Sequence, residues 1–563
     1  MLINELSQKT RLTKKAIRFY ENKGLIEVKR LKNGYRDYDE NNLKRLKEIK
    51  LLRLIGLSVS DICLYYNKIA LLDDLFDKRK KEVKTECGKY SLQYENLCSL
   101  IDSFNLGHFD LQADFDETEP LCENELNCKC SIGIDIGTTS ISATVFGLEN
   151  NNQMDCFSIL YNTDIESINP YFSLQDVEII FQTVKQLTDY LIKRYKNAVS
   201  IGITGQMHGI LYIDAKGNCV SPFVNWQDKR GDLPYKDSTY SKVIGIPTGY
   251  GICTHFYNEM NGLVPENAAK ICSICDYIAM KLAGITKPLV HISLAHSFGA
   301  FDIEKSTFDI KKLKDLVNID FLPETTCENK ILGQYKGVPV SVAIGDNQAS
   351  FIACAVDDET LLVNFGTGSQ ICAVCQQTKY VGNCELRPLI DGKKILCGAA
   401  LSGGKSYALL ERFVRSLVGM EYSQYARIND LAKTAYDKKI KPLNVETLFY
   451  GKRSNSTIRG SITDIDSTNF TPEAFALGFD YGMAKELYDF YVEMPVKVNK
   501  IVASGNGIRK NETLKNVVGD MFGLPLYLSN IKEEAATGAM LFGALSAKII
   551  DDITHFVKRG NLL

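Results

Sequence analysis

The stretch Ile132-Gly133-Ile134-Asp135-Ile136-Gly137-Thr138-Thr139-Ser140 decides how most of the chain folds. Apolar residues alternate with small ones up to Asp135, which predicts a buried strand. Gly137 permits a sharp turn, and the hydroxyl residues after it gather O–H and N–H donors that can surround phosphate oxygens. The β-rich residues 141–146 predict a returning strand. Taken alone, the same pattern also fits an ordinary hairpin, so its meaning depends on the rest of the chain.

Length and composition indicate a soluble multidomain protein. The 563 residues predict three or more domains, and 45% apolar with 24% charged residues is ordinary for globular proteins. No apolar run approaches the ~18 residues of a membrane span, and the N-terminus lacks a basic-then-apolar signal pattern. We therefore expect a cytoplasmic protein without a membrane partner, whose 17 cysteines are reduced and mostly buried.

Charge is distributed unevenly along the chain. Residues 1–70 hold 16 Lys and Arg against 8 Asp and Glu, whereas the whole chain has a net charge of −2. The remainder is therefore acidic. This split predicts a small module that faces nucleic acid, joined to a larger neutral-to-acidic body.

The basic module has the pattern of a winged helix-turn-helix. Helices are predicted over about 2–9, 13–23, 40–55 and 58–66, with Thr13 and Ser58 as N-caps. Asn33-Gly34 is a strong hairpin signal and predicts a two-stranded wing. A solvated basic helical domain is the alternative, but turn chemistry, basic residues and wing aromatics agree on the winged form.

Three segments of this module resemble the MerR family of transcription regulators: Arg18-Phe-Tyr-Glu-Asn-Lys-Gly-Leu-Ile26, Asn33-Gly-Tyr-Arg-Asp-Tyr38 and Leu51-Leu-Arg-Leu-Ile-Gly-Leu-Ser58. The resemblance covers residues 1–70. It implies duplex DNA as a partner and places six side chains at or near the DNA, on the recognition helix or the wing: Lys14, Lys15, Arg18, Tyr20, Arg36 and Tyr38.

A long helix and an acidic linker are expected next. Apolar residues from Val83 to Phe104 recur in steps of four and three, a 3.5-residue period typical of a coiled coil. We therefore predict a dimerising helix over 71–104 and a homodimer, with packing of this helix on its own domain as the alternative. Residues 105–130 form the linker. Its cysteines, Cys122, Cys128 and Cys130, lack the further ligands that a metal site normally has.

Polar turns recur at the ends of predicted strands beyond residue 131. Residues 201–209 form a strand that ends in Gln206-Met-His208-Gly. The only tryptophan, Trp226, is followed by Asp228 and Arg230, a combination that suits a sugar because the ring covers apolar carbons while charged groups bind hydroxyls. For His208, a hydrogen-bonded core position is equally compatible with the sequence.

Three further turns complete the pattern. Residues 342–350 deliver Asp346 to the start of a helix, where a carboxylate can accept the proton of an attacking hydroxyl. Residues 361–369 repeat the strand–Gly–Thr design of residues 132–139, and two such turns facing each other would hold a polyphosphate. Residues 503–507 precede another helix, and their glycines permit close approach of the backbone to a nucleotide.

Together these motifs resemble the FGGY family of carbohydrate kinases over about 131–553. The resemblance implies a two-domain α/β actin-like (ribonuclease H-like) sugar kinase, divided into 131–355 and 356–553, that uses ATP and Mg²⁺. It implies that Asp346 is the catalytic base and that Asp135 holds the metal. The phosphate and ATP ligands would be Gly137, Thr138, Thr139, Gly366, Thr367, Gly368, Ser369, Gly505, Asn506, Gly507 and Asn511. The sugar ligands would be Gln206, His208, Trp226, Asp228 and Arg230.

The sequence motifs leave alternatives for the sugar substrate and for how the DNA-binding region and the kinase region work together. Gln-Met-His-Gly and Trp-x-Asp-x-Arg are similar to ketose kinases, and Gly249-Tyr250-Gly251 favours the sedoheptulokinase branch. One segment departs from that branch: Ser293-Leu-Ala-His-Ser297 stands where Ser-Asn-Ala-Ala-Ser is expected. We expect a sugar kinase that also regulates transcription; a regulator whose kinase fold only senses sugar or nucleotide is the alternative.

Overall fold

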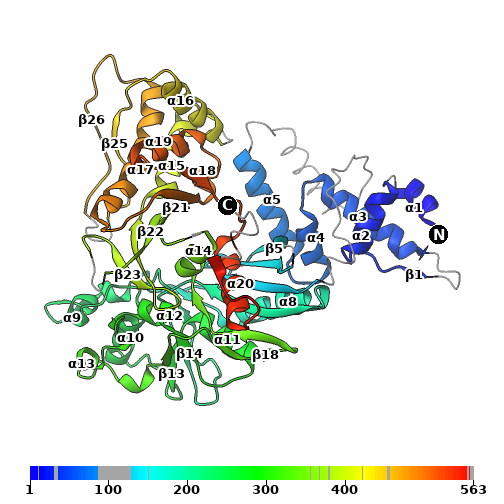
Figure 1. Cartoon of the computed structure of the whole chain (residues 1–563), viewed down its shortest axis with the longest axis horizontal. Helices are drawn as coiled ribbons and strands as arrows, with labels where there is room; N and C mark the ends of the chain where they lie inside the picture. The colour runs from blue at the N-terminus through cyan, green and yellow to red at the C-terminus, as the bar shows by residue number, and fades with distance from the viewer. Residues whose placement is uncertain are drawn as a thin grey trace.

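The computed structural model shows an N-terminal module beside two larger lobes (Figure 1). It describes residues 1–10, 12–30, 36–86, 128–149, 151–354, 357–366, 368–377, 381–420, 423–452, 457–554 and 557. None of the helices in these ranges combines the length and apolar character needed to cross a membrane.

The N-terminal module contains four helices, three of which begin at side-chain caps. They are α1 (Ile3–Thr10), α2 (Lys14–Asn22), α3 (Glu40–Leu54) and α4 (Val59–Tyr66). The Thr13 hydroxyl accepts a hydrogen bond from the Ala16 backbone at 3.1 Å, and Ser58 forms a capping box with Asp61, which confirms both predicted caps. β1 (Lys29–Arg30) and β2 (Arg36–Asp37) pair antiparallel as the wing. The predicted turn at residues 33–34 lies outside the described residues.

Helix α5 (Leu72–Glu86) leads away from this module and packs against strand β5 (Asn152–Leu160) of the first lobe. The helix predicted over 71–104 therefore begins as expected. Its later part and nearly all of the linker predicted over 105–130, including Cys122, lie outside the described residues. Dimerisation through this helix stays a prediction.

A seven-stranded mixed sheet forms the first lobe, in the order β18-β19-β8-β3-β4-β5 with β20 also paired to β8. Besides β5, the strands are β3 (Cys130–Ile136), β4 (Ser140–Gly147), β8 (Ala198–Gly205), β18 (Ile331–Tyr335), β19 (Val338–Ser341) and β20 (Ile344–Gly345). β3 and β4 form the predicted hairpin, with Ile136 opposite Ile141. Helices α8 (Val177–Arg194) and α11 (Ile274–Ala283) belong to this lobe.

The second lobe is built on a six-stranded sheet in the order β23-β24-β22-β21-β27-β28. Its strands are β21 (Thr360–Phe365), β22 (Ser369–Cys375), β23 (Glu385–Pro388), β24 (Lys394–Ala400), β27 (Lys500–Ser504) and β28 (Leu526–Leu528). Its main helices are α15 (Gly403–Leu417), α16 (Tyr425–Asp437), α17 (Pro472–Glu493) and α19 (Glu512–Phe522). The antiparallel β21–β22 hairpin repeats the β3–β4 hairpin, so the predicted internal repeat is present in the fold.

Two helices connect the lobes at the centre of the molecule. α14 (Asp346–Cys354) packs against α20 (Glu534–Ser546), and α20 packs on β3 and β8 of the first sheet although it lies late in the chain. A Cβ on Gly133 would lie 1.9 Å from the Ala536 carbonyl oxygen, and one on Gly202 would lie 1.7 Å from that of Ala539. These glycines therefore allow α20 to lie directly on the sheet.

Short elements complete the described structure. They are β6 (Asp164–Ile165), β7 (Leu174–Gln175), β9 (Leu211–Ile213), β10 (Phe223–Val224), η1 (Arg230–Asp232), β11 (Pro234–Tyr235), β12 (Ser238–Thr239), α9 (Tyr240–Ile244), α10 (Gly251–Met260), β13 (Lys270–Cys272), β14 (Leu289–His291), α12 (Ile292–Ala295), η2 (His296–Phe298), β15 (Phe301–Asp302), β16 (Thr307–Phe308), α13 (Ile310–Leu313), η3 (Ile319–Phe321), β17 (Glu324–Thr326), β25 (Asn444–Glu446), β26 (Ser461–Thr463) and α18 (Asn506–Arg509).

Candidate active site

The turn after β3 is held by bonds from three separate segments. The Gly137 N–H donates to the Ser140 carbonyl at 2.9 Å, and the Tyr161 hydroxyl donates to the Gly137 carbonyl at 2.5 Å. The Trp226 indole N–H donates to the Thr138 hydroxyl at 3.0 Å, and that hydroxyl donates to Gln206 at 3.3 Å. Gln206 and Trp226, predicted to face a sugar, therefore lie against the phosphate-type turn.

Two carboxylates from different elements face the same space. Asp135 lies near the end of β3, and Asp346 is the first residue of α14. Burial, reinforced by the charges of Asp346 and Glu533, raises the pKa of Asp135 to about 8. Burial likewise raises the pKa of Asp346 to about 6, while the Arg387 guanidinium acts in the opposite direction.

The environment of Asp135 fits a divalent cation. Mg²⁺ is usually held by one or two carboxylates together with phosphate oxygens and water. Asp135 supplies such a carboxylate beside the phosphate-type turn, and a cation there would favour its ionised form against the burial and the neighbouring negative charges that raise its pKa. Among the described residues no group of three or more His, Cys, Asp or Glu side chains could hold a metal without other ligands. A metal at Asp135 would therefore need oxygens from a bound nucleotide.

The second phosphate-type turn borders a cavity of about 770 Å³. Its lining includes Gly366, Gly505, Asn506, Gly507 and Asn511, which the sequence assigned to ATP. The Ser369 hydroxyl is buried and has no hydrogen-bond partner among the described residues, as expected for a group that awaits a ligand. Gly368 lies in the same turn, whereas Thr367 lies outside the described residues.

Backbone geometry explains the glycine that opens this cavity. Gly505 has φ = +89°, and a Cβ there would lie 2.6 Å from the Phe365 carbonyl oxygen. Asn511 caps α19 by accepting from the Leu514 N–H at 3.0 Å, and its amide donates to Asp480 at 2.8 Å. Asn511 therefore shapes the cavity wall as well as bordering it.

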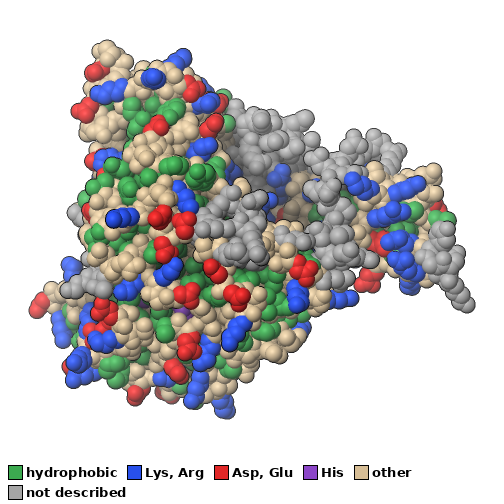
Figure 2. Space-filling view, viewed as in Figure 1, with side chains coloured by type: hydrophobic (Ala, Val, Ile, Leu, Met, Phe, Trp, Pro, Cys, Tyr) green, Lys and Arg blue, Asp and Glu red, His purple; other side chains and the backbone are tan. Residues whose placement is uncertain are grey.

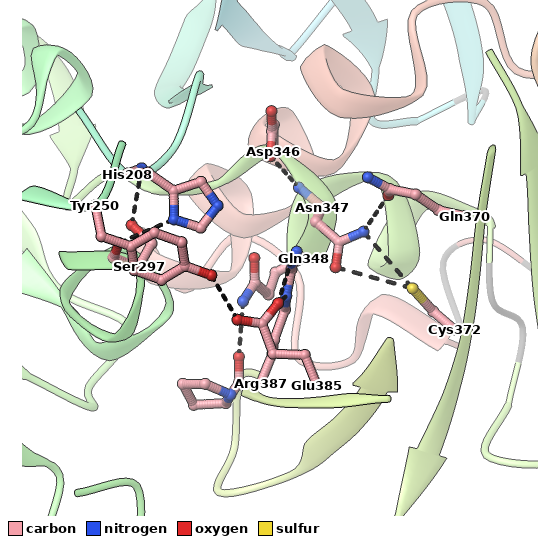
Figure 3. Close-up of polar contacts among 11 residues, drawn as sticks. His208, Tyr250, Ser297, Asp346, Asn347, Gln348, Gln370, Cys372, Glu385 and Arg387 are labelled. Atoms are coloured by element: carbon pink, nitrogen blue, oxygen red, sulfur yellow. Dashed lines mark hydrogen bonds and ion pairs between the residues drawn. The ribbon is translucent and has the colours of Figure 1, made fainter. Parts of the chain in front are cut away.

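His208 lies in the same group of polar residues as Asp346 and is held there by Ser297 and Tyr250 (Figure 3). It has φ = +73°, a strained value for a residue with a side chain. Its backbone N–H donates to the Ser297 hydroxyl at 3.1 Å, and its Nδ1 lies 2.9 Å from the Ser297 carbonyl oxygen. Its ring packs on Tyr250 with centroids 4.2 Å apart. The structure thus brings His208 and the departing segment 293–297 together.

Asp228 and Arg230 form an internal ion pair. Their side chains lie 2.7 Å apart at closest approach, and both residues are buried. Arg230 also donates to Asn258 at 2.5 Å and lies 4.2 Å from the centroid of the Phe172 ring. In the structure this pair braces the loop that carries Trp226, and a direct contact with the sugar stays a prediction.

The N-terminal module presents a basic surface, visible as the Lys and Arg side chains at the right of Figure 2. Lys14, Lys15 and Arg18 are exposed on α2. Tyr20 and Tyr38, by contrast, are only 2% and 0% exposed. Their rings pack in the core of the module, which corrects the prediction that they face DNA; the apolar rings fill the space between helices and wing.

Arg36 on the wing makes an internal contact. Its Nε lies 2.8 Å from both carboxylate oxygens of Glu21 at the end of α2. The guanidinium therefore fastens the wing to the recognition helix. Contact with DNA by Arg36 stays a prediction.

Comparison with known proteins agrees with this geometry. Residues 1–67 match the model of the MerR HTH family regulatory protein, and residues 130–235 match the N-terminal domain of the FGGY family of carbohydrate kinases. The chain therefore joins a region similar to MerR regulators to a region similar to FGGY carbohydrate kinases.

Individual relatives match either the N-terminal module or the two lobes. Sedoheptulokinase of Mus musculus is 27% identical to this MerR–FGGY chain over 470 residues, 73% of the chain and 96% of that protein. The HTH-type transcriptional regulator CueR of Salmonella typhi is 42% identical over 62 residues, 11% of the chain and 45% of CueR. The ligand-bound xylulose kinase structure from Lactobacillus acidophilus has a TM-score of 0.67 at 19% identity, covering 77% of the chain and 92% of that structure, which shows a shared fold.

The similarity to sedoheptulokinase and xylulose kinase implies a sugar phosphotransferase. Several residues around Asp346 were not found from the sequence, among them Glu385 and Arg387 of β23. Their spacing of two residues places both on one face of a strand, but nothing in the sequence marks that this face meets the first lobe.

Proposed function

We propose that this MerR–FGGY chain is an ATP-dependent ketose kinase that also binds duplex DNA as a transcription regulator. One observation carries the kinase proposal. Asp346 heads helix α14, its charge acts on Asp135 at the end of the strand before the phosphate-type turn, and it lies in the same group of polar residues as the fixed His208 (Figure 3). A sugar hydroxyl and a γ-phosphate could meet at that carboxylate.

Each group of residues has a separate proposed role in phosphoryl transfer. Asp346 accepts the proton of the attacking hydroxyl, and its pKa of about 6 leaves it ionised at neutral pH. Asp135 would hold Mg²⁺, which neutralises phosphate charge when bound. The turns at Gly137–Thr139 and Gly366–Ser369 surround the phosphates, and Gln206, Trp226 and His208 orient the sugar. Excluding water and aligning the reactants supply the remaining acceleration.

Asp346→Asn tests this assignment because it keeps the side-chain shape and removes the base. We expect kcat to fall by about 10²–10⁴-fold while ATP·Mg²⁺ still binds. Purified protein is assayed with ATP·Mg²⁺ against a panel of ketoses and polyols. An unchanged rate in the variant would show that another group is the base.

The ketose assignment rests on relatives. The sedoheptulokinase and xylulose kinase similarities cover 73% and 74% of the chain, and both relatives are named for ketose substrates. We propose a sedoheptulose-like ketose as the acceptor.

The DNA-binding proposal rests on the exposed basic face of α2. Lys14, Lys15 and Arg18 project from it, and binding should weaken steeply with salt as counterions are released. We propose that a homodimer binds. Arg18→Ala should weaken binding to a duplex selected from random sequence by about 1–3 kcal/mol. Salt-independent affinity, or equal binding by a monomer, would contradict this.

A second function, a regulator whose kinase fold acts only as a sensor, is favoured by one contact region. Lys23, at the end of the recognition helix, reaches Asp155 of β5 at 3.4 Å, and Arg194 of α8 reaches the same carboxylate at 3.2 Å. Lys78 of α5 donates to the Ser158 carbonyl of β5 at 3.2 Å. β5 pairs with β4, which begins at the phosphate-type turn. A structural change caused by nucleotide binding at the turn could therefore be transmitted through β4 and β5 to the DNA-binding module without turnover. Absence of turnover with every sugar would favour this sensor function.

A further inference from the structure

Strand β23 brings the charged side chains of Glu385 and Arg387 from the second lobe into the group of polar residues around Asp346 and His208 (Figure 3). Arg387 donates from Nε and Nη2 to one carboxylate oxygen of Glu385, at 3.0 and 2.6 Å. The other oxygen accepts the Tyr250 hydroxyl at 2.8 Å. Tyr250 belongs to the first lobe and packs on His208. A continuous set of contacts therefore joins Arg387 to His208 across the lobes.

The departing segment 293–297 lies at the same place. Ser297 binds His208, and its neighbour His296 is 6% exposed. Burial lowers the pKa of His296 to about 4, with Glu385 acting in the opposite direction. Although burial raises it, the pKa of Glu385 is held well below its usual range by Arg387, His208 and His296. His296 therefore faces the ion pair of β23 and not only its own lobe.

Space remains beside Glu385 on the second lobe. Glu385 borders a cavity of about 110 Å³ that is lined by second-lobe residues, among them Lys452 and Glu486. A carboxylate has about four lone-pair sites, so Glu385, which already accepts three hydrogen bonds, can still accept one from a sugar hydroxyl.

We propose that Glu385, Arg387 and His296 form the wall of the sugar site that selects the length of the ketose. They bind the hydroxyls farthest from the reacting end. This inference rests on the proposed kinase function. A site built to hydrogen-bond a hydroxyl rejects a substrate that lacks it, because its buried polar groups are then left without partners. Five-carbon ketoses lack the distal hydroxyls that seven-carbon ketoses carry.

Substrate discrimination is the decisive measurement. The kcat/KM of the wild type, Glu385→Gln and His296→Ala is measured with xylulose, fructose and sedoheptulose. We expect both variants to lose at least about tenfold more with sedoheptulose than with xylulose, the value of one hydrogen bond. An equal loss with all three sugars would show a merely structural role and overturn the inference.

A control variant and binding assays distinguish failure of the sugar-wall proposal from failure of the kinase proposal. Glu304→Gln, which removes an exposed charge of the first lobe, should leave the discrimination unchanged. Binding of an ATP analogue to each variant shows that the nucleotide cavity is intact. If the wild type turns over none of the sugars, the kinase proposal fails, and calorimetric binding of the same three sugars then tests the wall. Sugar binding without a length-dependent change in the variants, or no binding at all, would overturn it.

Discussion

At the scale of single residues, the candidate site places two negatively charged carboxylates close together in a buried position. Asp135 and Asp346 face the same space, and burial makes the ionised form of each costly. Such a site is less stable without its ligands than a neutral one. Activity and stability should therefore respond in opposite ways to removal of a carboxylate.

Asp135→Asn tests whether removal of a carboxylate raises stability while it lowers activity. The folded-state pKa of Asp135 is raised to about 8, so its ionisation lowers the stability of the folded form as pH rises from the unfolded pKa of 3.8 toward 8. The ligand-free variant should have a higher Tm than the wild type, by about 2–4 °C for each kcal/mol gained. The difference should grow between pH 5 and 8 in scanning calorimetry, whereas activity with ATP·Mg²⁺ should be lost. A Tm difference independent of pH would contradict the assignment.

The pH dependence of turnover follows from Asp346. Only the ionised carboxylate can accept a proton, and its pKa is about 6. We expect kcat/KM to fall about tenfold for each unit below that pH. Asp346→Asn, which cannot ionise, should have a low rate without this inflection.

At the scale of elements, helix α20 determines how the first sheet can be built. It lies so close that Gly133 and Gly202 have no room for a side chain. Gly133→Ala should therefore destabilise the fold by more than the ~1 kcal/mol that separates glycine from alanine in propensity, because the backbone must move apart. Chemical denaturation measures this. Gly392→Ala, where a Cβ meets open space but φ is +70°, is the control for backbone strain alone.

At the scale of the whole molecule, the DNA-binding module and the kinase share a buried ionic contact. The side chains of Lys23 and Asp155 are 12% and 10% exposed, so the pair is screened little by salt. The exposed face of α2 stays available for DNA while the end of α2 is anchored to β5. If the proposed homodimer forms, a ligand-induced movement of the lobes would change the spacing of its two recognition helices through this contact.

Asp155→Asn tests this coupling. In the wild type, sugar with a non-hydrolysable ATP analogue should change the affinity for the selected duplex by about 1–3 kcal/mol, and DNA should change ligand affinity by the same factor. In Asp155→Asn the change should shrink, whereas Asp358→Asn, which removes an exposed ion pair with Lys393, should keep it. Identical titrations with and without ligands in the wild type would show two domains that are joined but not coupled.

The sequence by itself determined the order of the domains and the character of the turns. Asp135-Ile-Gly-Thr-Thr and Gly345-Asp346 carry their turn and helix-start signals within a few residues, so the local pattern was sufficient to predict these elements. The caps Thr13 and Ser58 are likewise local. Tyr20 and Tyr38 were misplaced because a tyrosine suits both a DNA surface and a core.

Only the tertiary structure decided which distant groups meet. Glu385 reaches Tyr250, and Lys23 reaches Asp155, over separations of 135 and 132 residues. Such contacts depend on how the lobes and the module pack, and no local period or spacing encodes them. The glycines of β3 and β8 are a second example. The sequence does not show why a side chain is excluded there, because the excluding helix, α20, lies more than 300 residues later in the chain.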